Sequence, residues 1–200
     1  MLRRLDLRGA GLDLAGRLPD ATVDEVEAFY GRWAGTYVED RLRNDWLLQL
    51  GRQRDWTTVA QEYPRYRMND DKEVRCYALG TDAQLSKPET PAELKKLWYA
   101  LKDSDDGCTT VAEKLHEAKK LDTLDLWRKA RLAMDNNRPR AAQAALNIES
   151  VEIGKQAILI HADPQKYLDK RIVAFTRKRK ELSVLALMRI ANTDPDKAAQ

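Results

Sequence analysis

Apolar side chains recur every three or four residues along nearly the whole chain, whereas the strict alternation typical of β-strands is hard to find. This period predicts helices near residues 23–33, 37–53, 56–63, 71–81, 91–103, 108–120, 123–136, 138–147, 150–161, 164–179, 181–192 and from 195 onward. The connections between them are short, so we expect consecutive helices to pack antiparallel.

Signals for helix starts support these boundaries. Thr22 is followed three residues later by Glu25, which predicts a capping box in which each side chain bonds an unpaired backbone N–H. Thr90 before Pro91 repeats this logic, with proline at the first helical position. Two further starts with a cap and a proline are predicted at Asp163-Pro164 and Asp194-Pro195.

The apolar stripes on these helices are too short to be buried by one helix alone. The four clearest stripes are Val38, Leu42, Trp46 and Leu50; Leu94, Leu97, Trp98 and Leu101; Leu124, Trp127, Leu132 and Met134; and Leu182, Leu185, Ala186, Met188 and Ile190. Each stripe needs the next helix, which is the physical basis of a solenoid. We therefore predict an all-α fold, an α-superhelix or solenoid of antiparallel helix pairs. It forms a single domain over residues 1–200, with residues 1–20 irregular or left from a preceding hairpin.

Composition agrees with an elongated helical array. Hydrophobic residues make up 43% of the chain and charged residues 34%, which is too apolar for disorder and rich in charge for a compact globule. The net charge of only +3 argues against a dedicated nucleic-acid-binding protein. No run of about 18 apolar residues is present, so no transmembrane helix is predicted. The first 20 residues also lack the apolar run of a signal peptide.

Few residues are candidates for chemistry. Cys76 and Cys108 are the only cysteines, and their spacing suits no zinc motif. They form either a disulfide between two helices or a pair of unbonded core thiols, and the residues themselves leave both open. His116 and His161 have no carboxylate arranged as a catalytic partner, and we expect His116 to be solvated. The sequence therefore predicts no catalytic, cofactor-binding or metal-binding residue.

The strongest local excess of basic residues is a cluster between residues 170 and 180, within the predicted helix 164–179 and just before the helix at 181–192. We interpret this basic cluster first as a solvated helix face. The alternative is contact with an anionic polymer, either nucleic acid, with salt-sensitive affinity, or murein bearing peptide carboxylates. The residues proposed for this contact are Lys170, Arg171, Arg177, Lys178, Arg179 and Lys180. With the charge nearly balanced, no nucleic-acid partner is expected.

The segment from Val23 to Leu79 resembles the N-terminal helical region of soluble lytic murein transglycosylases. Its central feature is a helix of the form R-x-x-W-L-x-x-L-G-x-x-x-D-W, followed by a helix that bears a cysteine. The matching residues are Arg43, Trp46, Leu47, Leu50, Gly51, Asp55, Trp56 and Cys76. The stretch around Cys108 is similar to the next segment of the family's helical region, in which a second cysteine forms a disulfide with the first. The C-terminal segment, residues 163–199, is similar to later superhelical repeats of the family. The resemblance therefore covers nearly the whole chain.

Enzymes of this family are periplasmic and cleave the bond between N-acetylmuramic acid and N-acetylglucosamine in peptidoglycan, without water, to 1,6-anhydro products. Their catalytic Glu lies in a lysozyme-like domain at the C-terminal end. The Gly-Leu-Met-Gln segment of that domain is absent here, and we interpret Ser150 as a helix cap with Glu149 just outside it.

The resemblance therefore implies a non-catalytic superhelical region, either truncated at both ends or a degenerate copy, that is inactive alone and needs no cofactor. Its partners would be peptidoglycan glycan strands, reached through the intact periplasmic enzyme. The alternative is a stand-alone helical-repeat scaffold that binds proteins.

Overall fold

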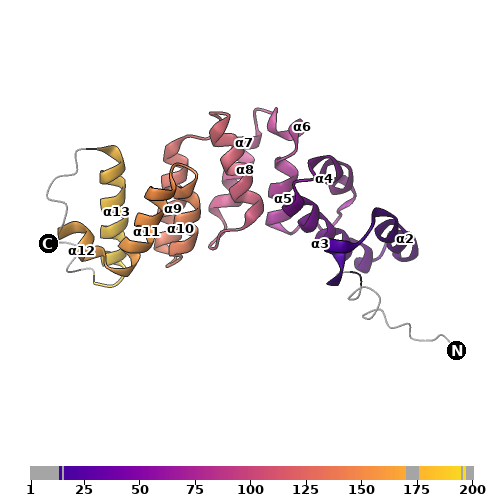
Figure 1. Cartoon of the computed structure of the whole chain (residues 1–200), viewed down its shortest axis with the longest axis horizontal. Helices are drawn as coiled ribbons and strands as arrows, with labels where there is room; N and C mark the ends of the chain where they lie inside the picture. Colours follow the sequence, from indigo (N-terminus) through magenta and orange to yellow (C-terminus); the bar gives the residue numbers. More distant parts are fainter. Residues whose placement is uncertain (1–13, 15, 170–175, 195, 197–200) are drawn as a thin grey trace. The chain divides into compact units, whose positions relative to one another are not determined.

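The structure is a computed structural model that describes residues 14, 16–169, 176–194 and 196 (Figure 1). Within these residues the regular secondary structure is helical and no strand is present. The predicted all-α class with antiparallel helix pairs is confirmed. The chain divides into two compact units, Met1–Lys87 and Pro88–Gln200, which we call unit 1 and unit 2 and describe separately. That residues 1–200 form a single domain, with an irregular or hairpin-derived start, stays a prediction.

The helices of unit 1 follow one another with short connections. In chain order they are η1 (Leu18–Asp20), α2 (Val23–Trp33), α3 (Tyr37–Gln53), α4 (Trp56–Glu62), η2 (Tyr63–Arg65), α5 (Lys72–Leu79) and α6 (Asp82–Leu85). The long helix α3 is central, because it packs against η1, α2, α4 and α5. The elements η1, η2 and α6 are absent from the sequence prediction, since three or four residues are too few to show a helical period.

Side-chain caps fix the starts of the helices in unit 1. The Glu25 N–H donates to Thr22 Oγ1 at 3.3 Å, and the Thr22 N–H donates to the Glu25 carboxylate at 2.9 Å, which confirms the predicted capping box. Between α3 and α4, Arg54 adopts a left-handed backbone with φ of 62°. Asp55 then accepts a hydrogen bond from the Thr58 N–H at 3.1 Å and starts α4.

The core of unit 1 contains the stripe predicted on α3. Its buried members are Leu42, Trp46 and Leu50, and Val38 is partly buried. One turn further along, Gly51 allows α5 to approach closely. A Cβ atom on Gly51 would lie 2.3 Å from ring atoms of Tyr77, which is completely buried. A glycine is therefore required where α3 meets α5, which gives a physical reason for one residue of the family resemblance.

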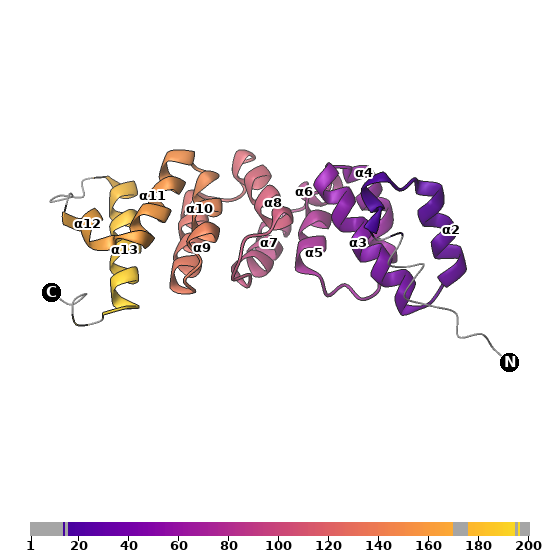
Figure 2. The ribbon, with the colours of Figure 1, turned by 60° about the horizontal axis from the view of Figure 1, so that its bottom comes forward.

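Unit 2 is also built from consecutive helices. They are α7 (Thr90–Tyr99), α8 (Asp106–Glu117), α9 (Thr123–Asp135), α10 (Pro139–Asn147), α11 (Val151–Ala162), α12 (Pro164–Asp169) and α13 (Arg177–Ala191). Helix α10 packs against both α9 and α11, and both views of the ribbon show these three side by side (Figures 1 and 2). Helix α13 packs against α9, α11 and α12. Each helix thus buries its apolar stripe against its neighbours.

The structure confirms the stripe on α13 and corrects the one on α9. The buried residues of α13 are Leu182, Leu185, Ala186 and Ile190, and the fifth member of the predicted stripe, Met188, is partly buried. On α9, Leu124 is 42% exposed, and the buried face is completed by Leu126 and by two alanines, Ala130 and Ala133. The predicted stripe does not include these alanines, although a small residue lets neighbouring helices approach closely.

Several helix boundaries in unit 2 differ from prediction, as in α8, which spans Asp106–Glu117 where residues 108–120 were expected. Helix α7 starts at Thr90, one residue early, because Thr90 is buried in the first turn and the N-cap residue Glu89 makes no side-chain cap. Helix α13 starts at Arg177 rather than at residue 181, after an N-cap at Thr176. Ser150 caps α11 as predicted, by accepting a hydrogen bond from the Glu152 N–H at 3.2 Å. Of the start predicted at Asp194-Pro195, Pro195 and residues 197–200 lie outside the described residues.

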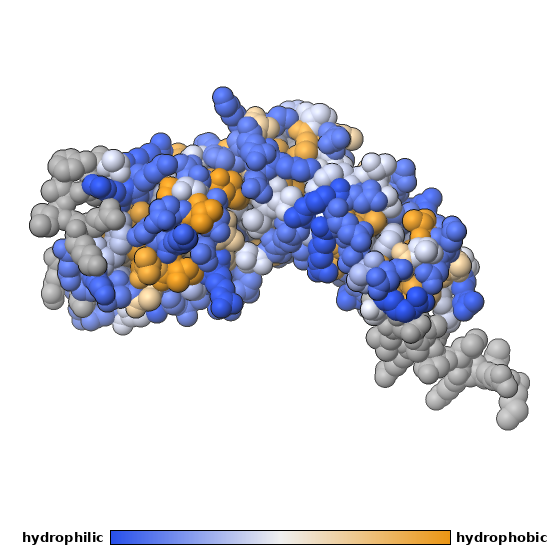
Figure 3. All heavy atoms as spheres, viewed as in Figure 1, coloured by the Kyte–Doolittle hydropathy of each residue, from blue (hydrophilic) through white to orange (hydrophobic). Residues whose placement is uncertain are grey.

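Hydrophilic residues cover most of the face shown in Figure 3, and apolar side chains appear only in small areas. The large apolar residues that are exposed are Val23, Tyr37, Leu124, Val151, Leu159, Val184 and Leu187. None of the described helices combines the length and the apolar character needed to cross a bilayer.

A lysine is buried where α7 meets α9. The side chain of Lys129 is 1% exposed, and its Nζ donates to the carbonyl oxygens of Trp98 at 2.7 Å and Leu101 at 2.6 Å. The last carbonyls of a helix have no partner within it, and a cation at this end is favoured by the helix dipole. Burial lowers the pKa of Lys129 to about 8, although Asp105 and Asp103 act in the opposite direction. Lys129 thus connects α9 to the C-terminal end of α7 by hydrogen bonds.

The lowered pKa of Lys129 predicts that stability rises with pH. Between the folded pKa of about 8 and the ordinary value of 10.5, the unfolded chain binds the proton that the folded chain has released. We expect the free energy of unfolding to increase by about 2 kcal/mol from about pH 7 to about pH 9.5, measured by urea titration with circular dichroism. Lys129→Met should be less stable and lack this slope; a variant with the wild-type slope would show that another group is responsible.

Candidate functional site

An open groove lies on unit 1 between α2 and α4. Its volume is about 510 Å³, within the range of ligand sites in proteins. The lining residues, which define the α2–α4 groove, are Val23, Val26, Glu27, Trp46, Thr58, Gln61, Glu62 and Arg65. They come from α2, α3, α4 and η2, so no short motif contains them. Sequence reasoning missed the groove for that reason.

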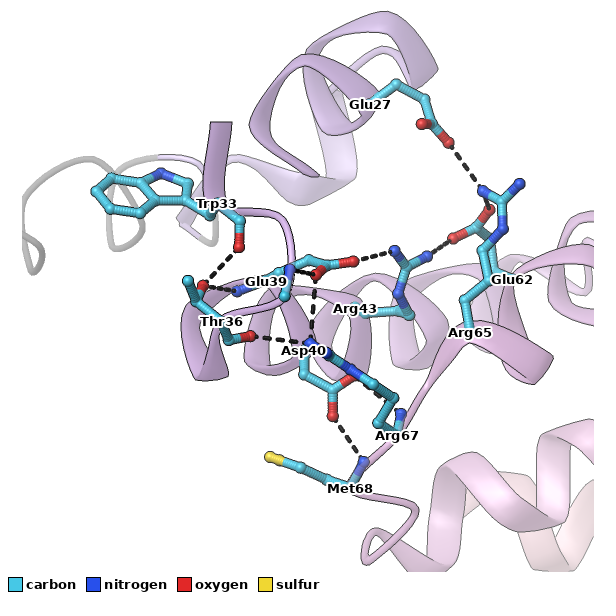
Figure 4. A network of polar contacts seen from close by, with 11 residues as sticks. Glu27, Trp33, Thr36, Glu39, Asp40, Arg43, Glu62, Arg65, Arg67 and Met68 are labelled. Carbon is cyan, nitrogen blue, oxygen red and sulfur yellow. Dashed lines mark hydrogen bonds and ion pairs between the residues drawn. The ribbon is translucent and has the colours of Figure 1, made fainter. Parts of the chain in front are cut away.

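A buried arginine connects the helices that form the groove (Figure 4). The side chain of Arg43 on α3 is 3% exposed and pairs with Glu39 at 2.8 Å and with Glu62 of α4. Its guanidinium lies 3.9 Å from the centroid of the Tyr30 ring on α2. One side chain therefore holds α2, α3 and α4 together.

Glu62 belongs to both this network and the groove. Its carboxylate also accepts a hydrogen bond from Arg65 at 3.1 Å, and Arg65 pairs with Glu27 at 3.4 Å (Figure 4). Burial by itself would raise the pKa of Glu39, but hydrogen bonds, led by that from Arg43, outweigh it and hold the pKa below its usual value. All three carboxylates are ion-paired, so the network is suited to holding helices rather than to transferring protons.

A second set of polar contacts fixes the segment that follows η2. Asp40, which is 2% exposed, accepts hydrogen bonds from the N–H groups of Arg67 at 2.9 Å and Met68 at 2.7 Å (Figure 4). Tyr66 donates to Asp70 at 2.6 Å, which lowers the pKa of the Asp70 carboxyl. Burial and this hydrogen bond raise the pKa of Tyr66. The backbone after η2 is therefore held on α3, which positions Arg65 at the groove.

The groove contains groups that are available to a ligand. The Gln61 side chain is exposed and makes no hydrogen bond to another described residue. Arg65 uses Nη1 for its contacts with Glu27 and Glu62, so its other N–H groups are available among the described residues. Val23 is 58% exposed at the edge. The groove thus offers an apolar strip at the Val23 edge beside hydrogen-bond donors and acceptors.

The predicted basic cluster is only partly described. Lys170 and Arg171 lie outside the described residues, whereas residues 177–180 form the first turn of α13 and are exposed. Lys178 Nζ lies 2.6 Å from Glu149, so one of the four charges in this turn is neutralised. Contact between the cluster and a polyanion stays a prediction.

Glu149 is the centre of a polar cluster in unit 2. It accepts hydrogen bonds from Lys178 and, at 3.0 Å, from Thr123 Oγ1, and the bond from Lys178 is the main cause of its lowered pKa. The prediction that His116 is solvated is wrong, because the ring is only 24% exposed. Its Nδ1 donates to the Leu121 carbonyl at 2.9 Å, and its Nε2 lies 3.9 Å from Glu149. The end of α8 and the starts of α9, α11 and α13 therefore meet around one carboxylate.

Both cysteines, Cys76 on α5 and Cys108 on α8, are completely buried and disulfide-bonded. The chain has no other cysteine, so the bond joins these two and closes the intervening loop. Of the two alternatives left open by the residues, the structure contains the disulfide. In the described part of the chain, no group of three or more His, Cys, Asp or Glu side chains is arranged to hold a metal ion.

Comparison with known proteins gives matches among solved structures. No family model and no curated protein matches the sequence. The complex of the 70-kDa soluble lytic transglycosylase with bulgecin A matches with a TM-score of 0.61 and 17% identity over 94% of this chain. An inactive mutant of the lytic transglycosylase Slt from Pseudomonas aeruginosa matches with a TM-score of 0.55 and 24% identity, also over 94% of this chain. This chain spans 31% of each of those proteins and has the fold of a helical part of soluble lytic transglycosylases.

Proposed function

We propose that this chain is the non-catalytic helical region of a periplasmic soluble lytic transglycosylase and that it binds peptidoglycan glycan strands. The observation that carries the proposal is the match of 94% of the chain to the fold of two lytic transglycosylases. The run from Arg43 to Trp56 resembles the same family in sequence. In the intact enzyme this region would orient the catalytic domain for non-hydrolytic cleavage of the MurNAc–GlcNAc bond to 1,6-anhydro products.

The geometry of the polar clusters supports a binding role without chemistry of its own. Glu39 and Glu62 are engaged by Arg43, and Glu149 is engaged by Lys178 and Thr123. These contacts hold neighbouring helices together, so the three carboxylates have a structural role in the region that would bind the glycan. The disulfide supports placement in an oxidising compartment such as the periplasm.

Two assays on the purified 200-residue chain test the proposal. We expect the chain to sediment with insoluble peptidoglycan sacculi and to produce no lysis zone in a murein zymogram. A clear lysis zone would refute the non-catalytic role. Failure to sediment with sacculi would contradict peptidoglycan binding and favour the stand-alone protein-binding scaffold. Repeating the sedimentation with Arg177, Arg179 and Lys180 changed to glutamine shows whether the basic turn of α13 contributes.

A further inference from the structure

We propose that the α2–α4 groove is an accessory binding site for N-acetylated sugar rings. The inference rests on the proposed function and deepens it, because it assigns the contact with glycan to particular residues of unit 1. The ligand class is a neutral saccharide that carries acetamido groups. Three features of the groove favour it: the apolar strip, the free planar polar groups and the balance of charge.

The apolar strip suits the acetamido methyl group. Val23 is 58% exposed at the start of α2 and supplies most of the accessible apolar surface, whereas Val26 and Trp46 line the groove but are only 1% and 6% exposed. A sugar ring bears hydroxyl groups in most directions, so a wholly apolar pocket would leave them without partners. A strip on one side of the groove accepts a methyl group or one apolar ring face and leaves the hydroxyl groups directed toward the polar side.

The polar side of the groove offers planar hydrogen-bonding groups. The Gln61 carboxamide has both donors and an acceptor and is not engaged by another described residue. The Arg65 guanidinium holds Glu27 and Glu62 through Nη1 and presents further N–H donors. Such forked groups can bond two neighbouring oxygen atoms at once, as adjacent hydroxyl groups or a hydroxyl and an acetamido carbonyl provide.

The charges in and next to the groove favour a neutral ligand. Glu27 and Glu62 are matched by Arg65 at the groove and by the buried Arg43. An anionic ligand, such as the carboxylates of a stem peptide, would meet two carboxylates. A cationic ligand would have to displace arginines that are already paired. Discrimination of this kind arises from unfavourable contacts with the wrong ligand as much as from favourable contacts with the right one.

The groove is also held in shape before a ligand arrives. Arg43 ties α4 to α3 and contacts α2, and the bonds from Arg67 and Met68 to Asp40 hold the backbone beyond Arg65. A site whose walls are fixed loses less conformational entropy on binding than one that must be assembled. This rigidity favours binding even where the groove is open to solvent.

A titration of the full 200-residue chain with chitotetraose, a neutral N-acetylglucosamine oligomer, tests the inference. We expect weak, saturable binding seen as shifts in ¹H–¹⁵N NMR spectra of residues around the groove. Gln61→Ala should weaken the affinity about fivefold or more, because it removes hydrogen bonds to the ligand at an exposed position that does not carry the fold. Val23→Glu, which places a charge on the apolar strip, should weaken it at least as much. Gln53→Ala, an exposed glutamine at the end of α3, is the matched control and should bind like the wild type.

Three results would overturn the site: no saturable binding of chitotetraose, equal loss of affinity in the Gln61 and Gln53 variants, or saturation of the groove by a free stem peptide instead of the saccharide. Sedimentation with sacculi separates this inference from the proposed function. If the chain sediments with sacculi but fails the chitotetraose titration, the groove assignment is wrong while peptidoglycan binding stands. If it binds neither, both are wrong.

Discussion

Replacing Arg43 by methionine is expected to lower the free energy of unfolding by about 3–5 kcal/mol. The Arg43 side chain is 3% exposed and pairs with both Glu39 and Glu62. Methionine replaces much of the alkyl volume but leaves Glu62, whose side chain is 9% exposed, with the exposed Arg65 as its one ionic partner among the described residues. The cost arises mainly from a buried charge that has lost its compensation. Urea unfolding followed by tryptophan fluorescence measures it.

Two further variants show whether burial causes this loss. Arg41 lies on the same helix, is 57% exposed and pairs with Asp45 at 3.4 Å, so Arg41→Met should cost less than about 0.5 kcal/mol. Adding Glu62→Gln to Arg43→Met should recover part of the loss, because the uncompensated charge is then removed. Equal losses in the two arginine variants, or no recovery in the double variant, would contradict a buried ion pair as the centre of unit 1.

The sequence could not predict this network, for a geometric reason. A helix with one buried face shows its orientation in the spacing of its apolar residues. Helix α3 has neighbours on several sides, so Asp40, Arg43 and Asn44 are buried although their polarity predicts exposure. Apart from Glu39, which lies one turn from Arg43 on the same helix, the partners of Asp40 and Arg43 lie about 20 to 30 residues away along the chain. No local pattern identifies partners at that distance, and the groove was missed together with the network.

Helix positions were predictable because the signals for them are local. The capping box at Thr22 and Glu25 needs only residues three apart, and the structure confirms it. The same is true of Ser150, where α11 begins as predicted. The errors arise where tertiary burial overrides a local signal. Thr90 is a residue type preferred at N-caps, but it is buried within the first turn of α7. His116 has charged neighbours in sequence but packs toward Glu149 in the fold.

Reducing the disulfide between Cys76 and Cys108 is expected to lower the free energy of unfolding by about 3–4 kcal/mol. The bond closes a loop of about 30 residues, and opening it increases the conformational entropy of the unfolded chain. Both cysteines are completely buried, so the two thiols formed by reduction keep the sulfur atoms in apolar surroundings and leave no cavity. The loss should therefore reflect the unfolded chain more than native packing. Urea unfolding with and without dithiothreitol measures it.

A variant without cysteines separates the disulfide from other effects of the reductant. In Cys76→Ala/Cys108→Ala, dithiothreitol should leave the unfolding curve unchanged, whereas the wild-type midpoint should move to lower urea concentration. Intact-mass measurement should find the unreduced wild-type chain lighter than the reduced chain by two hydrogen atoms. Two free thiols after expression in an oxidising compartment would contradict both the bond and the stabilisation derived from it. They would also remove the support that the disulfide gives to a periplasmic location, while the helical fold, which depends on caps and apolar stripes, would be unaffected.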